Sequence, residues 1–167
     1  EIAEFYNQET SDLILGGKPD FVIDAIDNLT AKSFLIAECV KKGIRIISST
    51  GAAARLDPTM VKLTDLANSH TDPMAAQLRK ILRTRHEFPK TGDLGVPCVF
   101  PEEFPMLPVE LKYDLGQGFK CVCPQGQNDF HSCDKRNTIY GNASFVTGTF
   151  GFTMASWVIR QVTEKGK

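Results

Sequence analysis

The sequence predicts an α/β fold built on a parallel sheet, and three observations support this prediction. Residues 21–26 and 44–48 are short apolar runs typical of buried strands, and residues 30–42 between them have a helical pattern. This strand–helix–strand order is a βαβ unit, which gives parallel strands joined by a right-handed crossover. The chain has 167 residues, 42% of them hydrophobic and 23% charged, values that are typical of a globular domain with a core.

Local signals place the first elements. Residues 1–12 are polar and give no clear prediction. The first strand is followed by Asp27 and Asn28, residue types that end strands and cap helices. Gly43 ends the helix with a left-handed residue, and the second strand follows it directly.

The remaining strands come after a turn. Residues 60–64 are expected to form a third strand and residues 96–100 a fourth. Between them, Asp72 followed by Pro73 is typical of a helix start, and the apolar positions of residues 73–84 recur at helical spacing.

The C-terminal part divides into an irregular segment and a helix. Residues 101–140 are rich in Pro and Gly, and a loop of this length is usually functional or disordered. Residues 142–162 are expected to form a helix. Residues 141–159 carry no charge, which approaches the length of a transmembrane span. Because polar residues and glycines interrupt this stretch, we expect a helix buried inside a protein, apolar on most sides, and do not expect a membrane as a partner.

Overall charge and cysteine usage exclude some classes of protein. The 19 Lys and Arg residues balance 20 Asp and Glu residues, so the net charge of −1 indicates no polyanionic partner by itself. Five cysteines at uneven spacing do not resemble a disulfide framework, which favours a reducing compartment.

The first candidate site is Asp27 with Asn28, after the first strand. Ligands of open α/β sheets bind in the crevice at the carboxyl ends of the strands. A carboxylate there suits Mg²⁺ beside nucleotide phosphates, since Mg²⁺ typically takes only one or two protein carboxylates. The alternative is that both residues only end the strand and cap the next helix.

The second candidate is the small-residue turn around Gly51, after the second strand. Small residues let a ligand such as a nucleotide approach the backbone. The turn is not a P-loop, because the Gly-x-x-x-x-Gly-Lys pattern is absent. Arg55, just beyond it, is interpreted either as a phosphate contact or as a solvated loop residue.

The third candidate is a basic segment, residues 79–90, which carries five positive charges and one negative charge. Arg79, Arg83 and Arg85 are its candidate RNA-binding residues, because a basic helix face can supply sequence-independent contacts to phosphates. The alternative is a solvated helix surface.

The fourth candidate is a cysteine group made of Cys121, Cys123 and Cys133, with His131 nearby. Soft ligands this close together fit a zinc site, although the spacing is not that of paired Cys-x-x-Cys motifs. A redox pair, a single reactive thiol and buried structural cysteines are the alternatives. Cys98 lies in an apolar strand and is interpreted as a core residue.

Several of these segments resemble the ThiF/MoeB/HesA family of adenylating enzymes, which are related to ubiquitin-activating enzymes. The resemblance begins with residues 21–28 (FVIDAIDN), followed by Lys32, Cys39 and Gly43-Ile44. It narrows to the tRNA threonylcarbamoyladenosine dehydratase branch through residues 50–53 (TGAA), 56–59 (LDPT), 65–67 (DLA), 72–79 (DPMAAQLR), 94–100 (LGVPCVF) and 143–152 (ASFVTGTFGF).

The resemblance implies a Rossmann-like sheet of the ThiF adenylation type and an ATP-dependent, tRNA-modifying enzyme. Such an enzyme uses ATP to activate the carboxylate of threonylcarbamoyladenosine, and loss of the activating group closes a ring, helped by proximity. Asp27 matches the aspartate that holds Mg²⁺ near the phosphates, and Asn28 matches the residue after it. The basic segment then becomes a tRNA contact, and the resemblance further implies a homodimer.

Two other hypotheses about the function stay open. An activating enzyme for a ubiquitin-like sulfur-carrier protein would have the same fold and would form a covalent adduct with its partner through a cysteine. A non-catalytic RNA- or protein-binding domain is a third class. A cytoplasmic location is expected, with a mitochondrial or membrane-associated one as the alternative in a eukaryote.

The sequence departs from the family pattern in two places. The glycine-rich nucleotide loop and its phosphate-binding residues precede the Asp24–Asn28 segment in the family, and only twenty residues precede the first strand here. We therefore expect residues 1–167 to be a partial adenylation domain whose N-terminal nucleotide-binding half is largely missing. The cysteine group also does not reproduce the two Cys-x-x-Cys zinc pairs of the relatives.

Overall fold

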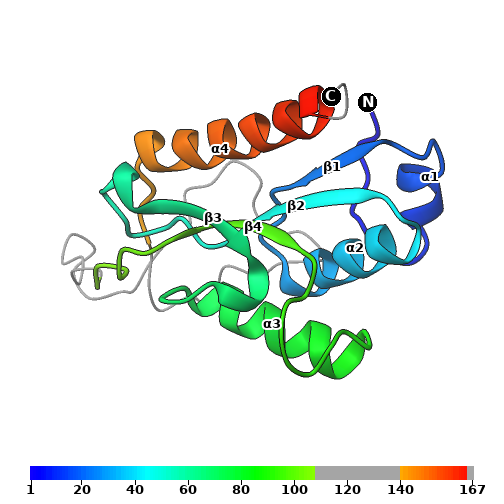
Figure 1. Cartoon of the computed structure of the whole chain (residues 1–167), viewed down its shortest axis with the longest axis horizontal. Helices are drawn as coiled ribbons and strands as arrows, with labels where there is room; N and C mark the ends of the chain where they lie inside the picture. Colours follow the sequence, from blue (N-terminus) through cyan, green and yellow to red (C-terminus); the bar gives the residue numbers. More distant parts are fainter. Residues whose placement is uncertain (108–139, 165–167) are drawn as a thin grey trace, which may run out of the picture.

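The computed structural model describes residues 1–107 and 140–164. Four strands form one open sheet, with α2 and α3 on one face and α4 on the other (Figure 1). The elements in chain order are α1 (Ser11–Leu15), β1 (Phe21–Asp24), α2 (Leu29–Lys41), β2 (Arg45–Ser49), η1 (Pro58–Met60), β3 (Val61–Asp65), η2 (Leu66–Asn68), α3 (Pro73–Arg85), β4 (Pro97–Pro101) and α4 (Ser144–Thr163).

The predicted βαβ unit is confirmed. β1 and β2 pair in parallel, with Asp24 opposite Ser48, and α2 forms the crossover between them. The Asn28 side chain accepts a hydrogen bond from the Ala31 backbone N–H at 3.0 Å, which starts α2 where the sequence placed it. β1 is shorter than predicted and ends at Asp24, because the Ile26 N–H donates to the Asp24 carboxylate at 3.0 Å and begins a turn.

The direction of β3 differs from the expected parallel sheet. The strand order is β1-β2-β4-β3, and β3 runs antiparallel to β4, with Val61 opposite Pro101. Parallel neighbours need a long crossover, usually a helix, and the connection from β2 to β3 contains only the short turn η1. α3 supplies the missing crossover later, so β4 is the strand that pairs in parallel with β2.

Each face of the sheet has its own apolar core. Ile46 packs with the buried residues of α2 and α3, and Ile47, the next residue of β2, packs with those of α4. Alternate residues of a strand point to opposite faces, so β2, buried on both sides, reads as a continuous apolar run in the sequence.

α4 corrects the expectation of a helix apolar and buried on most sides. Only Val146, Phe150 and Met154, spaced four residues apart, are buried against the sheet. On the outer face Phe152 is 80% exposed and Ile159 is 62% exposed. No helix within residues 1–107 and 140–164 is long and apolar enough to cross a bilayer.

Candidate functional site

The candidate site lies at the carboxyl ends of the parallel strands. The turn with Asp27 and Asn28 follows β1, and the turn with Gly51 follows β2. Because β1 and β2 are adjacent and parallel, as predicted, the two turns lie at the same edge of the sheet. Loops at this edge form the ligand crevice of open α/β sheets.

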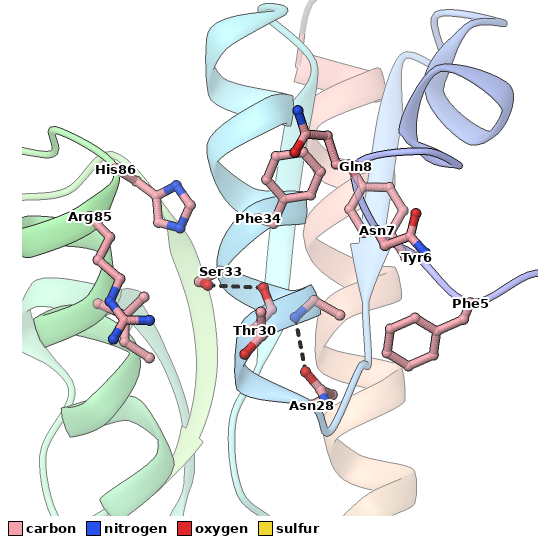
Figure 2. A pocket seen from close by; sticks show the side chains of 12 residues that line it. Phe5, Tyr6, Asn7, Gln8, Asn28, Thr30, Ser33, Phe34, Arg85 and His86 are labelled. Carbon is pink, nitrogen blue, oxygen red and sulfur yellow. Dashed lines mark hydrogen bonds between the residues drawn. The ribbon is translucent and has the colours of Figure 1, made fainter. Parts of the chain in front are cut away.

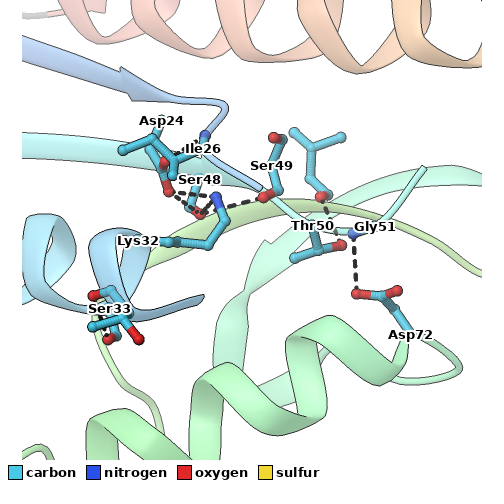
Figure 3. A network of polar contacts seen from close by, with 11 residues as sticks. Asp24, Ile26, Lys32, Ser33, Ser48, Ser49, Thr50, Gly51 and Asp72 are labelled. Carbon is cyan, nitrogen blue, oxygen red and sulfur yellow. Dashed lines mark hydrogen bonds and ion pairs between the residues drawn. The ribbon is translucent and has the colours of Figure 1, made fainter. Parts of the chain in front are cut away.

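A buried polar cluster underlies this edge (Figure 3). The Lys32 Nζ donates to Asp24 Oδ2 at 2.6 Å and to Ser48 Oγ at 3.2 Å, and Ser48 Oγ donates to the same Asp24 oxygen at 2.6 Å. None of the three side chains is more than 1% exposed. The sequence did not predict this cluster: Lys32 entered only as part of the family resemblance, and the local signal was a lysine in the first turn of a helix whose other buried residues are uncharged.

Asp27 lies at the same edge with its carboxylate free to bind a cation. Its side chain is exposed, and it makes no hydrogen bond or ion pair with the other residues the structure describes. No group of three or more His, Cys, Asp or Glu side chains is gathered for a metal within that part of the chain. A single free carboxylate nevertheless fits Mg²⁺, which is usually held by one or two carboxylates together with phosphates and water.

Gly51 has a structural reason to be glycine. Its backbone N–H donates to Asp72 Oδ2 at 3.1 Å, and a Cβ atom on Gly51 would lie 2.6 Å from Asp72 Oδ1. Asp72 also caps α3 by accepting from the Ala75 N–H at 2.8 Å. The turn after β2 is therefore tied to the N-terminus of α3, as Figure 3 shows for Gly51 and Asp72.

Arg55 is buried, whereas the sequence suggested either a phosphate contact or a solvated loop residue. It is 4% exposed, and its guanidinium lies 3.3 Å from the Asp72 carboxylate in a buried ion pair. The same group donates to the backbone carbonyl of Ala53 at 2.7 Å. Arg55 is thus a structural residue of this turn, buried and bonded to protein groups rather than solvated.

The three arginines of the basic segment lie in different environments. Arg79 donates to the Ser69 carbonyl at 2.9 Å, and Arg83 donates to the Pro89 and Gly92 carbonyls at 3.1 and 3.0 Å. These two side chains hold loops beside α3. Arg85 is exposed.

Arg85 lies at a cavity of about 480 Å³ next to the start of α2. Figure 2 shows Arg85 and His86 on one side, the N-terminal segment on the other, and Thr30 and Phe34 of α2 with its N-cap Asn28 between them. Burial and the neighbouring Arg85 lower the pKa of His86. The fold therefore brings Arg85 together with Asn28, whereas Arg79 and Arg83 are engaged elsewhere.

The cysteine predictions have two outcomes. Cys98 is a free, buried core residue as expected, and Cys39 is buried too. Burial raises the pKa of the Cys39 thiol to about 11 and that of Cys98 to about 12, so both are poor nucleophiles. Cys121, Cys123, His131 and Cys133 lie outside the described residues, and their zinc assignment stays a prediction.

Curated relatives of this chain include two bacterial enzymes with the same name. The tRNA threonylcarbamoyladenosine dehydratase of Escherichia coli is 35% identical over 147 residues, which cover 87% of this chain and 52% of the relative. The enzyme of the same name from Haemophilus influenzae is 30% identical and covers 98% of this chain and 58% of the relative. The chain therefore spans about half the length of the curated relatives that it matches.

Solved structures agree with these relatives. A structure described as TcdA (CsdL) superposes with a TM-score of 0.76 at 30% identity, covering 99% of this chain and 57% of that one. The E. coli dehydratase in complex with ATP superposes with a TM-score of 0.75 at 29% identity, covering 99% of this chain and 56% of that one. At this level the Rossmann-like sheet of the ThiF adenylation type is confirmed. A model of the ThiF family matches residues 2–167, and the chain therefore belongs to the ThiF family.

Proposed function

We propose that this chain carries part of the machinery of an ATP-dependent tRNA threonylcarbamoyladenosine dehydratase. The observation that carries the proposal is the exposed Asp27 carboxylate at the carboxyl end of β1, in a chain 30–35% identical to dehydratases of that name. ATP binding by a solved neighbour supports a nucleotide site at this edge of the sheet.

The proposed chemistry is activation of a carboxylate followed by ring closure. The substrate carboxylate displaces pyrophosphate from ATP, and a nucleophile of the same nucleoside then displaces AMP, so that one water is lost from the nucleoside overall. Because both reacting groups belong to one molecule, proximity favours the second step over hydrolysis. Bound Mg²⁺ would supply positive charge that stabilises the phosphates as charge develops on them.

The chain's own residues would have distinct roles in this reaction. Asp27 would hold Mg²⁺, and Asn28 would keep the turn in place by capping α2. Gly51 would let the nucleotide approach the backbone of the second turn. Arg85, exposed at the cavity beside Asn28, is the arginine best placed to contact tRNA. Arg79 and Arg83 remain proposed contacts with weaker support, since both are engaged with backbone carbonyls.

The test is made on the chain itself and on the chain fused behind the residues that precede the matching region in the E. coli relative. Each protein is incubated with ATP, Mg²⁺ and tRNA that contains threonylcarbamoyladenosine, and the nucleosides are analysed by mass spectrometry. We expect the extended protein to produce the nucleoside lacking one water. If neither protein does so, the proposed function is wrong.

Asp27→Asn tests the proposed metal ligand. It should lower the rate of the extended protein by about 10²–10³, the usual cost of losing one group that stabilises developing charge. Asp20→Asn is the matched control, because Asp20 is also exposed but precedes β1, at the opposite end of the parallel strands. Near-normal dehydration by Asp27→Asn would contradict the Mg²⁺ role.

The remaining proposals concern partners and location. A homodimer is proposed from the resemblance alone. The free thiols of Cys39 and Cys98 support a reducing compartment such as the cytoplasm. The sulfur-carrier alternative gains no support from these two cysteines, because both are buried with raised pKa values. Cys-to-Ser replacement at Cys121, Cys123 and Cys133 tests it, since a covalent route should lose activity with one of them.

A further inference from the structure

We propose that Lys32 is a positioning residue for the metal site, acting through Asp24 on the turn that carries Asp27. The inference rests on the proposed function only in taking Asp27 as a metal ligand. It assigns a role to a buried lysine that the proposed chemistry does not use.

Side-chain contacts hold both ends of the turn between Asp24 and Asn28. Lys32 in the first turn of α2 reaches back 2.6 Å to Asp24 Oδ2, and Asp24 Oδ1 accepts the Ile26 N–H at 3.0 Å (Figure 3). Asn28 closes the other side by capping α2 through the Ala31 N–H. The residues between Asp24 and Asn28, Asp27 among them, are therefore fixed at both ends.

The cluster of Asp24, Lys32 and Ser48 is better explained by a role in positioning the turn with Asp27 than by a contribution to the stability of the fold. Burying a charged pair costs desolvation that the attraction often only offsets, and an apolar replacement of similar volume is frequently as stable. Such a replacement at Asp24 would, however, leave the Ile26 N–H without its acceptor. The charged cluster therefore adds a defined conformation of the turn. Residues that hold metal ligands in place typically raise metal affinity, and their loss lowers it.

Lys32 also sets the charge at the site. Asp24 and Asp27 are both carboxylates of the same short segment. Lys32, 0% exposed, pairs with Asp24 and so leaves Asp27 as the unpaired charge of that segment. A cation approaching the turn is therefore directed to one carboxylate.

The experiment compares single and compensated variants of the extended protein. Lys32→Met breaks the pair, Lys32→Arg keeps the charge, and the triple variant Asp24→Leu/Lys32→Met/Ser48→Ala replaces the whole cluster with apolar side chains. Mn²⁺ binding in the presence of ATP is measured by electron paramagnetic resonance, and stability is measured by urea unfolding. Amide hydrogen exchange at Ile26 reports on the turn without any nucleotide.

We expect Lys32→Met and the triple variant to weaken Mn²⁺ binding about 10–100-fold, the range typical of lost support behind metal ligands. Lys32→Arg should recover most of the affinity. The triple variant should unfold at nearly the parent urea concentration and yet exchange the Ile26 amide faster than the parent does.

Two results would overturn the inference. One is a triple variant that regains parent Mn²⁺ affinity together with its stability, because the cluster would then be merely structural. The other is an Asp27→Asn variant that binds Mn²⁺ as well as the parent does. Since these readouts need no tRNA, failure of the proposed dehydration would be seen separately in the nucleoside assay.

Discussion

Asp72 is the residue whose loss we expect to disturb the site edge most. Its carboxylate accepts hydrogen bonds from the Gly51 N–H at 3.1 Å and from the Ala75 N–H at 2.8 Å, and it pairs with Arg55 at 3.3 Å. The side chains of Asp72 and Arg55 are 2% and 4% exposed. Asp72→Ala therefore removes a helix cap and leaves a buried guanidinium without its counter-charge.

The free energies of losing a helix cap and of breaking a buried ion pair are known in order of magnitude. Removing an N-cap costs about 0.5–2 kcal/mol. Breaking a buried ion pair by removing one partner costs about 3–5 kcal/mol, because the other charge stays buried. One side chain supplies both contacts and the site can relax, so we expect about 4 kcal/mol in total, a large share of the roughly 5–15 kcal/mol that stabilises a typical protein.

Urea unfolding measures this loss through the single tryptophan. Trp157 of α4 packs edge-on against Phe21 of β1, so its fluorescence reports on the packing of helix and sheet. Arg55→Met and the double variant complete a mutant cycle. If the buried charge dominates, the double variant should be clearly more stable than the sum of the single losses predicts. A loss below about 1 kcal/mol for Asp72→Ala, or additive single losses, would refute the reasoning.

Two further predictions concern glycine and cysteine. Gly51→Ala should destabilise the chain by about 1–3 kcal/mol in urea unfolding, the usual cost of overpacking, because its Cβ would meet Asp72. Gly148→Ala in α4 is the matched control: a Cβ there meets nothing within 4 Å, so it should stabilise the helix by about 0.5–1 kcal/mol. The buried thiols predict a pH dependence, since burial raises the pKa values of Cys39 and Cys98 from 9.0 to about 11 and about 12. Protonated thiols then contribute stability that is present below pH 9.0 and is lost as the pH rises through these values. The urea midpoint should fall from pH 8 to pH 10 by more in the parent than in a Cys39→Ala/Cys98→Ala variant, and equal falls would contradict the assignment.

The elements that sequence reasoning located are those with local signals. Asn28 caps α2 from three residues away, and Gly43, with φ +68°, ends the same helix. Asp72 and Pro73 start α3 in the same way. These contacts are made within a few residues, so the pattern of neighbouring residue types was enough to predict them.

Contacts between distant residues were not predictable in this way. Arg55 and Asp72 are 17 residues apart, and Asp24 and Ser48 are 24 apart. A lone arginine in a loop looks the same whether it is solvated, bound to phosphate or buried in an ion pair. The direction of β3 was missed for a related reason, because it depends on which segment supplies a crossover rather than on the strand's own residues.

The structure adds a physical reason for choosing Asp27 that the sequence did not contain. Asp24, Asp27 and Asp72 all belong to segments at one edge of the sheet, and the sequence favoured Asp27 by its position after the first strand and by the family resemblance, without showing which carboxylates are paired. Lys32 pairs with Asp24, and Arg55 pairs with Asp72. A carboxylate that is already paired and buried would have to lose its partner before it could bind a cation, whereas an exposed one need only lose water. Pairing therefore separates two carboxylates that hold the turns in place from one, Asp27, that is free to act.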